Sequence, residues 1–385
     1  MGDRIATAPG GVILIIDVHR RYRNVNTGEV SNKITDLIGN EATVRRDFAT
    51  GGNKWKELKT LFKEIDIVPY TELIPEDLNF KFRGKKISKE EVCERFIDAL
   101  TNSVKNHWDR NKFHVVQHSM GVDSTALSCI IKKLYDSGEI GGKIFFMCYE
   151  PEGIIFRKIM EHEGWPEENY GIYNEGAPGR EYSKKALTMS EAWKMFDCVW
   201  KWPMWNRVWA VEEFRGKGII PMDDGDLQYH GAGGVDELVR QNPIFPTSLY
   251  GFLDTIYYHV APSYWEGTLH VMDSEVLRLL IENDWGVKND GYLALKRQWL
   301  GLLDPDIVEL PNSLHGLQID YRRITPSIVD RMISDYKASW YGRNIDPDIV
   351  SSADDIIQYS SWYGAWSAAV ITEHLINEGI SLKVE

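Results

Sequence analysis

The feature that most constrains the fold is an alternation of strand-like and helix-like segments between residues 113 and 160. Residues 113–118 and 144–148 have the length and composition of buried strands. Each is followed by apolar side chains at helical spacing, in 125–135 and 154–160. Because strands that alternate with helices pair in parallel, the sequence predicts an α/β fold with a parallel sheet flanked by helices.

A capped helix is predicted to lead into this alternation. Ser88 and Glu91 form a capping box, in which the two side chains satisfy amides at the start of a helix. Ile87 and Val92 occupy the apolar positions that flank such a cap, and apolar side chains then recur at helical spacing to about His107. We therefore expect a domain boundary just before this helix.

The remaining segments are less regular. We expect a helix from Pro203 to about Phe214, stopped by two glycines, and a strand at Leu227–His230. Helical patterns predict an α-helical C-terminal half, with segments starting at Asp273, Tyr292, Thr325 and about Ser351. Three local predictions fall in the first 85 residues: a buried strand at Val12–Ile16, a turn at Gly51–Asn53 and a short helix at Trp55–Phe62.

Composition narrows the class of protein. Hydrophobic residues make up 43% and charged residues 26%, as in globular proteins, which excludes a disordered chain. The net charge of −13 argues against a broad nucleic-acid surface, which requires a basic face. No apolar segment approaches the roughly 20 residues that span a membrane. The acidic balance fits an enzyme with a small-molecule substrate better than a nucleic-acid binder. The four cysteines are scattered, as in a cytoplasmic protein with reduced thiols.

A polar loop separates the first predicted strand of the sheet from its helix. Amides at a helix start bind anions, Gly121 lets the backbone approach a phosphate, and Ser119, Ser124 and Thr125 add hydroxyl donors. Asp123 suits this place if Mg²⁺ lies between its carboxylate and the phosphate. The alternative is an ordinary strand–loop–helix connection with an Asp or Ser cap.

This loop resembles the S-G-G-x-D-S loop of the ATP pyrophosphatases (PP-loop enzymes), which split ATP into AMP and pyrophosphate. Met120 stands where that family usually has its first Gly. Residues 231–238 resemble the S-G-E-G-x-D-E-L segment of the asparagine synthetase domain, and Leu269–Ile281 resembles its P-F-L-D segment. The resemblance covers roughly residues 88–320 and implies a Rossmann-like PP-loop fold.

The resemblance implies ATP and Mg²⁺ as ligands and assigns a role to each matching position. The pyrophosphate of ATP would contact Ser119, Met120, Gly121, Val122, Asp123, Ser124 and Thr125. Mg²⁺ would be held by Asp123 and Asp236. The adenine would lie near His118, Cys148, Gly231 and Ala232. Lys288 would neutralise the leaving pyrophosphate, and the substrate pocket would include Asp197, Gly233 and Glu237. For Asp236 and Glu237 the alternative is an acidic pair at a helix start, and for Lys288 a solvated loop residue.

Several positions depart from the family pattern. Gly233 replaces the Glu of S-G-E-G, and Phe196–Val199 lacks the basic residue that grips aspartate. No Lys occurs near Pro311–Ser313, where the family has a late catalytic Lys. Gly2 occupies the position of the glutaminase Cys, and the region before Ser88 is too short for that domain. We therefore expect a substrate other than aspartate and an amine taken from solution or a second substrate.

Two groups of aromatic and imidazole side chains stay open in interpretation. Five tryptophans lie within seventeen residues and form either core or an aromatic wall for a substrate: Trp193, Trp200, Trp202, Trp205 and Trp209. His114, His118 and His230 flank the motifs and are expected to be structural strand residues near the site.

The expected organisation has three parts: a small N-terminal region at 1–87, the ATP-binding domain at 88–340 and a C-terminal helical extension at 341–385. The expected function is an ATP-dependent synthetase, a carbon–nitrogen ligase that adenylates a carboxylate and transfers it to ammonia or another amine. The alternatives are a nucleobase-modifying PP-loop enzyme and a non-catalytic nucleotide-binding or assembly protein. The sequence leaves the oligomeric state open, a homo-oligomer included.

Overall fold

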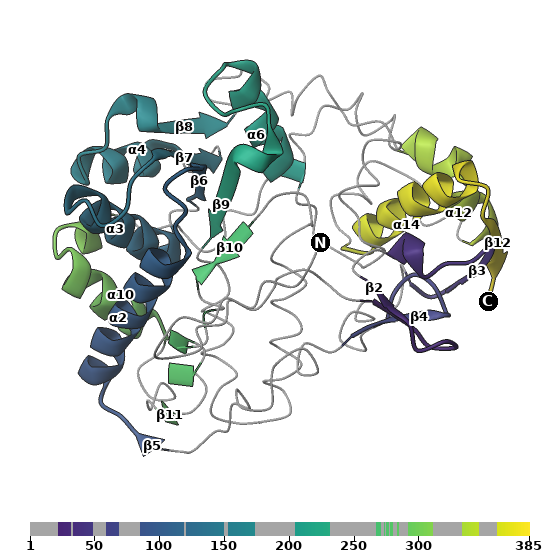
Figure 1. Cartoon of the computed structure of the whole chain (residues 1–385), viewed down its shortest axis with the longest axis horizontal. Helices are drawn as coiled ribbons and strands as arrows, with labels where there is room; N and C mark the ends of the chain where they lie inside the picture. The colour runs from purple at the N-terminus through teal and green to yellow at the C-terminus, as the bar shows by residue number, and fades with distance from the viewer. Residues whose placement is uncertain are drawn as a thin grey trace.

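The structure is a computed structural model, and it describes residues 22–31, 34–48, 59–68, 85–118, 121–149, 153–173, 205–231, 267–270, 273, 275–276, 278–279, 283–284, 292–310, 333–345 and 360–385. Figure 1 shows the described elements in two groups. The central group contains a parallel sheet with its helices, and the terminal group contains elements from both ends of the sequence. Among the described helices, none has the length and apolar character needed to cross a membrane.

The central group is built on one parallel sheet. Its strands are β6 (Phe113–Gln117), β7 (Lys143–Tyr149), β8 (Tyr170–Tyr173), β9 (Leu227–Gly231) and the short edge strand β10 (Gly267–Leu269). Their order is β10-β9-β6-β7-β8, and every neighbouring pair is parallel. The chain therefore builds outward from β6 in one direction and then returns to build from β6 in the other. The order of strands reverses between β6 and β9.

Helices cover both faces of this sheet (Figure 1). On one face lie α2 (Lys89–His107), α3 (Val122–Asp136), α4 (Gly153–His162) and α10 (Tyr292–Leu303), and on the other lies α6 (Trp205–Gly216). Short 3-10 turns follow at Glu167–Asn169, Asp224–Asp226 and Ile307–Glu309. The sheet is thus buried on both faces, which confirms the expected α/β fold with a parallel sheet flanked by helices.

Local sequence signals explain why these elements form. Ser88 caps α2 by accepting a hydrogen bond from the Glu91 amide at 3.1 Å, and Ile87 and Val92 are buried beside it. The helix predicted from Ser88 to about His107 is therefore confirmed. On the opposite face, a Cβ at Gly171 of β8 would lie 2.7 Å from the Phe214 ring, so this glycine lets α6 approach the sheet closely.

The terminal group joins residues that are far apart in the sequence. An antiparallel sheet contains β1 (Tyr22–Asn24), β2 (Val30–Ser31) and β4 (Ile65–Ile67), and a 3-10 turn covers Ile34–Asp36. β3 (Glu41–Val44) pairs in parallel with β12 (Ser381–Val384), beside α12 (Trp340–Asn344) and α14 (Ser360–Asn377). The expected first and third parts of the chain therefore share a two-stranded sheet. A separate two-stranded sheet pairs β5 (Lys85–Lys86) with β11 (Asn283–Asp284).

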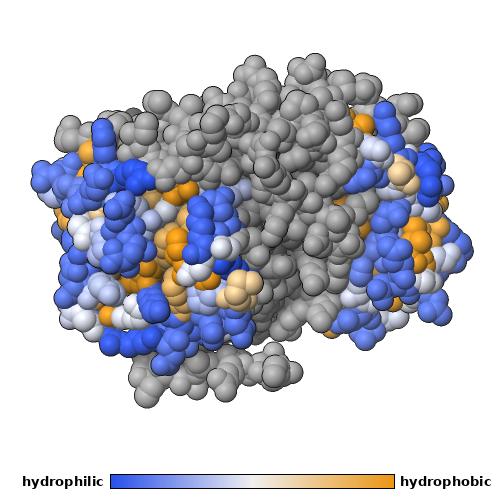
Figure 2. All heavy atoms as spheres, turned by 90° about the horizontal axis from the view of Figure 1, so that it is seen from above, coloured by the Kyte–Doolittle hydropathy of each residue, from blue (hydrophilic) through white to orange (hydrophobic). Residues whose placement is uncertain are grey.

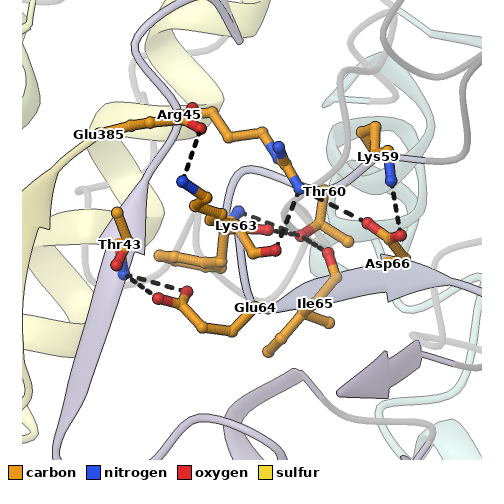
Figure 3. A network of polar contacts seen from close by, with 10 residues as sticks. Thr43, Arg45, Lys59, Thr60, Lys63, Glu64, Ile65, Asp66 and Glu385 are labelled. Atoms are coloured by element: carbon orange, nitrogen blue, oxygen red, sulfur yellow. Dashed lines mark hydrogen bonds and ion pairs between the residues drawn. The ribbon is translucent and has the colours of Figure 1, made fainter. Parts of the chain in front are cut away.

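A polar network at the surface links the strands of the terminal group (Figure 3). Asp66 forms ion pairs with Lys59 at 2.6 Å and with Arg45 at 3.5 Å. Both carboxylate oxygens of Glu64 accept hydrogen bonds from the Thr43 amide at 3.1 Å, and Lys63 pairs with Glu385 at 3.2 Å. These contacts join the β4 region to β3 and to the residue after β12.

Some expected elements differ from the structure. The short helix predicted at Trp55–Phe62 is wrong at its described end, because Lys59 bridges Asp66 and Phe62 bridges Val44 in antiparallel pairs. The C-terminal half contains α10, α12 and α14 but also β10, β11 and β12, so the described residues are not purely helical. The predictions at Val12–Ile16, Gly51–Asn53, Thr325 and Ser351 lie outside the described residues.

On the face shown in Figure 2, hydrophilic residues predominate over the described surface, and apolar residues are interspersed among them. Among the described residues, the large exposed apolar side chains lie in the β1–β2 hairpin, on α3 and α10 and in the connection from α6 to β9: Val25, Val30, Tyr135, Leu302, Ile219 and Met222.

Candidate functional site

The two sequence motifs begin at the same edge of the central sheet. The phosphate-loop motif follows β6, and the second motif starts in β9, whose last residue is Gly231. β6 and β9 are parallel neighbours, with Val116 opposite His230, so both strands end at the carboxyl edge. In open α/β sheets, ligands bind outside this edge, where the strand order reverses.

The described part of the phosphate loop is the start of α3. Gly121 is the N-cap residue, and the helix has no side-chain cap. The hydroxyls of Ser124 and Thr125 donate to the Gly121 carbonyl at 2.9 and 3.0 Å. These hydroxyls therefore brace the helix start, and the backbone amides of its first turn remain as the groups suited to an anion.

Asp123 is partly buried in the first turn of α3 and has at least one interacting neighbour. An acidic residue here is also stabilised by the helix dipole, whether or not it binds a metal. Within the described residues no cluster of three or more His, Cys, Asp or Glu side chains could hold a metal ion. The role of Asp123 in binding Mg²⁺ stays a prediction.

Several predicted site residues lie in other parts of the chain. Ser119, Met120, Ala232, Gly233, Asp236, Glu237, Asp197 and Lys288 lie outside the described residues. Three tryptophans of the cluster do as well (Trp193, Trp200 and Trp202), and the side chains of Trp205 and Trp209 on α6 are not described. The choice between a core and an aromatic wall therefore stays open.

His118 and Cys148, both predicted near the adenine, lie at the ends of neighbouring strands. The His118 amide donates to the Met147 carbonyl at 2.9 Å, next to Cys148. Both side chains are fully buried, and burial lowers the pKa of His118 to about 3, so its imidazole is neutral. The His118 and Cys148 side chains therefore lie in the core beneath the carboxyl edge and not on its exposed surface.

A carboxylate that the sequence analysis missed is linked to His118. Ser128 on α3 lies 3.3 Å from His118 Nε2 and donates to Glu163 Oε1 at 2.6 Å. Cys129 and Trp165 also donate to Glu163, at 3.4 and 2.8 Å. Burial raises the pKa of Glu163 to about 7, against the opposing effect of these hydrogen bonds. Glu163 thereby ties the end of α4 to α3 and carries a proton near neutral pH.

A chain of imidazoles crosses the sheet beneath α2. His114 Nδ1 of β6 lies 2.9 Å from His230 Nε2 of β9, and His230 Nδ1 lies 3.0 Å from His270 Nε2, just after β10. His270 Nδ1 lies 3.1 Å from the Ser103 hydroxyl of α2. The ring of Trp108 stacks on His114 and His230, with centroids 3.7 and 4.7 Å apart. His114 and His230 are buried strand residues, but their direct contact and its extension to His270 were not predicted.

The comparisons with known proteins add no relationship. Neither the protein-family models nor the curated proteins with which the chain was compared match it. A functional interpretation therefore rests on the residues, the sequence resemblance and the geometry described above.

Proposed function

We propose that the chain is an ATP-dependent synthetase of the PP-loop type, which forms AMP and pyrophosphate. It adenylates a carboxylate and transfers the acyl group to ammonia or another amine. The observation that carries this proposal is the position of the two motifs. They follow β6 and β9, the neighbouring strands at which the order of the sheet reverses. Counted from β6, the order 3-2-1-4-5 matches that of nucleotide-binding doubly wound sheets.

The residues at this edge suit a nucleotide phosphate. The first-turn amides of α3 have no side-chain cap and would bind the pyrophosphate of ATP. Carboxylates are ligands that Mg²⁺ prefers, so Asp123 and Asp236 would hold the ion, which offsets phosphate charge. Lys288 would add positive charge as pyrophosphate leaves. The chain's own contribution is to orient the reacting groups and stabilise developing charge.

The proposed substrate is a small carboxylate other than aspartate. Phe196–Val199 offers no basic side chain for the second carboxylate of aspartate, and Gly233 removes the family's Glu near the amine. The net charge of −13 fits a small molecule better than nucleic acid. We place the protein in the cytoplasm, in keeping with its scattered cysteines.

A pyrophosphate-exchange assay tests the proposal. The chain would be incubated with ATP, Mg²⁺, labelled pyrophosphate and a panel of carboxylates. Asp123→Asn should lower exchange by at least about 100-fold, because the metal loses a charged ligand. Asp136→Asn is the matched control at the other end of α3, where Asp136 pairs with Lys132, and it should stay within about twofold. Absence of both ATP binding and exchange with every carboxylate would refute the proposal.

The second candidate is a non-catalytic nucleotide-binding or assembly protein. It is favoured by Gly233, by the lack of a late Lys and by the Ser124 and Thr125 hydroxyls, which bond to the Gly121 carbonyl. ATP binding without turnover, and an Asp123→Ala variant that keeps its biological role, would support it. The nucleobase-modifying alternative requires an exposed reactive thiol, whereas the described cysteines (Cys93, Cys129 and Cys148) are buried.

A further inference from the structure

The chain of imidazoles beneath α2 is a continuous buried path between two edges of the central sheet. His114, His230, His270 and Ser103 are all fully buried, and 2.9, 3.0 and 3.1 Å separate successive nitrogen or oxygen atoms. The rings of His230 and His270 are parallel within 2°, with centroids 5.2 Å apart. Such distances are those of hydrogen bonds at every step.

The protonation states require the hydrogens of the imidazole chain to share one direction. Burial lowers the pKa of His114 to about 4 and that of His270 to about 3, and it lowers the pKa of His230 well below its usual value. A neutral imidazole has one N–H donor and one acceptor nitrogen, so all the hydrogens along the chain must point the same way.

The ends of the chain select between the two directions. If the Ser103 hydroxyl donates to His270 Nδ1, its O–H group has a hydrogen-bond acceptor. Each of the three rings is then protonated on Nε2. His114 Nε2 becomes the terminal donor. Within the described residues it has no partner of full hydrogen-bond geometry, although the nearby Asp109 carbonyl favours a proton on this ring.

The His114 end of the chain approaches the surface at the amino edge of the sheet. Gly142, in the exposed turn before β7, has φ +99°, and a Cβ built on it would lie 3.4 Å from His114 Nε2. Asp109 and Lys112 are the nearest charged side chains that act on this ring. The same Cβ would lie 3.1 Å from the Arg110 carbonyl and 3.2 Å from the Lys112 carbonyl, so the terminal imidazole is buried directly beneath the exposed turn.

The His270 end lies at the carboxyl edge. His270 follows β10, whose last residue, Leu269, is paired with Gly231 at the start of the second motif. Asp273 donates its amide to the His270 carbonyl at 3.2 Å and holds His107 at 3.4 Å, one helical turn beyond Ser103. His107 acts electrostatically on both His230 and His270. The His270 ring thus lies next to the edge at which the candidate site lies, and the buried Ser103 hydroxyl reaches this ring from α2.

Packing alone does not account for three linked imidazoles. Burial of polar rings costs desolvation free energy that apolar side chains of the same size avoid, and each hydrogen bond returns only part of it. An aligned chain of N–H donors and acceptors has a property that apolar packing lacks, since each ring can accept a proton on one nitrogen while releasing one from the other.

We propose that His114, His230 and His270 are a proton relay from the carboxyl edge of the sheet to the Gly142 turn. Its use rests on the proposed function. When ammonia attacks an acyl adenylate, a C–N bond forms, the bond between acyl carbon and phosphate oxygen breaks, and the products are an amide, AMP and one proton. Ser103 passes its proton to His270 Nδ1 and takes up the released one, while His114 Nε2 gives its proton to solvent water that enters at the exposed Gly142 turn. One passage leaves every ring protonated on Nδ1, so the chain must reverse before the next.

Nitrogen-15 NMR of the imidazoles tests the relay without any substrate. At pH 7 we expect three neutral rings protonated on Nε2, with scalar couplings across the two N–H···N bonds. The buried ring N–H of His270 should exchange with deuterium at least about tenfold faster than the amide of Val116, because exchange passes along the chain and needs no opening of the sheet. A charged ring, or two acceptor nitrogens that face each other, would overturn the proposal.

His230→Gln separates a relay from a structural role, because Gln keeps a donor and an acceptor but cannot pass a proton between them. We expect exchange at the His270 ring to slow about tenfold and to match that of nearby amides. His162→Gln, which breaks an exposed pair with Asp304, is the control. If His230→Gln does not fold, His114→Gln interrupts the same path. Unchanged exchange in a folded variant would overturn the relay.

The two half-reactions distinguish failure of the relay from failure of the proposed function. His230→Gln should slow amide formation by at least about tenfold and leave pyrophosphate exchange within about twofold. Unchanged amide formation would overturn the relay while the synthetase proposal stands. If the wild-type protein shows no pyrophosphate exchange, the synthetase proposal is refuted. The NMR measurements still decide whether the imidazoles transfer a proton.

Discussion

In the central group, the paired strands β6 and β7 are consecutive in the sequence, whereas in the terminal group β3 pairs with β12, and Glu41 and Lys383 lie 342 positions apart. The polar contacts differ as well. The central group buries histidines in its interior and Glu163 in part, and the terminal group keeps its charged network of Arg45, Lys59 and Asp66 partly exposed. We therefore expect the central group to depend on pH and core packing, and the terminal group to depend on long-range pairing.

The largest expected difference in stability between the two groups is at mildly acidic pH. His114, His118 and His270 have folded pKa values of about 4, 3 and 3, below the unfolded value of 6.5. Their contribution to stability is full above pH 6.5 and is lost as pH falls from 6.5 toward 4 and 3. At pH 5 each of these histidines lowers the free energy of unfolding by about 2 kcal/mol. Hydrogen exchange should show loss of protection at 113–117 before 41–44, and simultaneous loss would contradict the distinction.

Removal of one buried ring in each group is the next largest test. Phe146 of β7 is fully buried against Trp165, and Phe146→Ala should cost about 3–5 kcal/mol. Phe62→Ala removes an equally buried ring from the terminal group. Phe146→Ala should deprotect 143–149 and spare 381–384, and Phe62→Ala should do the reverse. Deprotection of both segments by either variant would mean that the groups unfold as one unit.

Glu163 should act in the opposite direction to the histidines. Its pKa is raised to about 7 from 4.5, so its contribution to stability is full below pH 4.5 and is lost as pH rises through 7. Glu163→Gln should remove a pH-dependent difference of up to about 3 kcal/mol between pH 4.5 and 8. Urea unfolding across this range measures it. Glu161→Gln is the exposed control on α4, and an identical pH slope in both variants would contradict the assignment.

The smallest effect is expected at the surface of the terminal group. Asp66→Asn should cost about 1 kcal/mol or less, because the close pair with Lys59 is partly exposed and the Arg45 nitrogen lies as far as 3.5 Å away. Thermal unfolding at low and high salt measures this, since salt screens such pairs. Glu41→Gln, which breaks the more exposed pair with Lys383, is the control. A loss of several kcal/mol on Asp66→Asn would mean that the network behaves as a buried one.

The same contrast explains what the sequence predicted. The parallel sheet and its capped lead-in helix were predictable because β6, α3, β7 and α4 carry their signals locally, in apolar periodicity and the Ser88 cap. β3 and β12 have only four residues each, and their pairing depends on partners that no local pattern identifies. The predicted Trp55–Phe62 helix failed for the same reason, since Phe62 meets Val44 instead.

The site was predictable where it follows strand ends and not where it depends on packing. The sheet brings the ends of β6 and β9 together, and with them His118 and Gly231. Glu163 stands in no motif, and His270 has no local signal that links it to His230. The nearest indication is that His114 and His230 stand among apolar residues on predicted strands, where a buried polar side chain is unusual.

The pairing of β3 with β12 has a consequence for biosynthesis. During translation β3 emerges long before its partner. With 342 positions between Glu41 and Lys383, synthesis at about 5–20 residues per second leaves the edge of β3 that faces β12 unpaired for roughly 17–70 s. An unpaired strand edge attracts other chains, so nascent molecules would be vulnerable to aggregation or dependent on a chaperone during this interval. The terminal group can thus mature only after the central group has had time to fold.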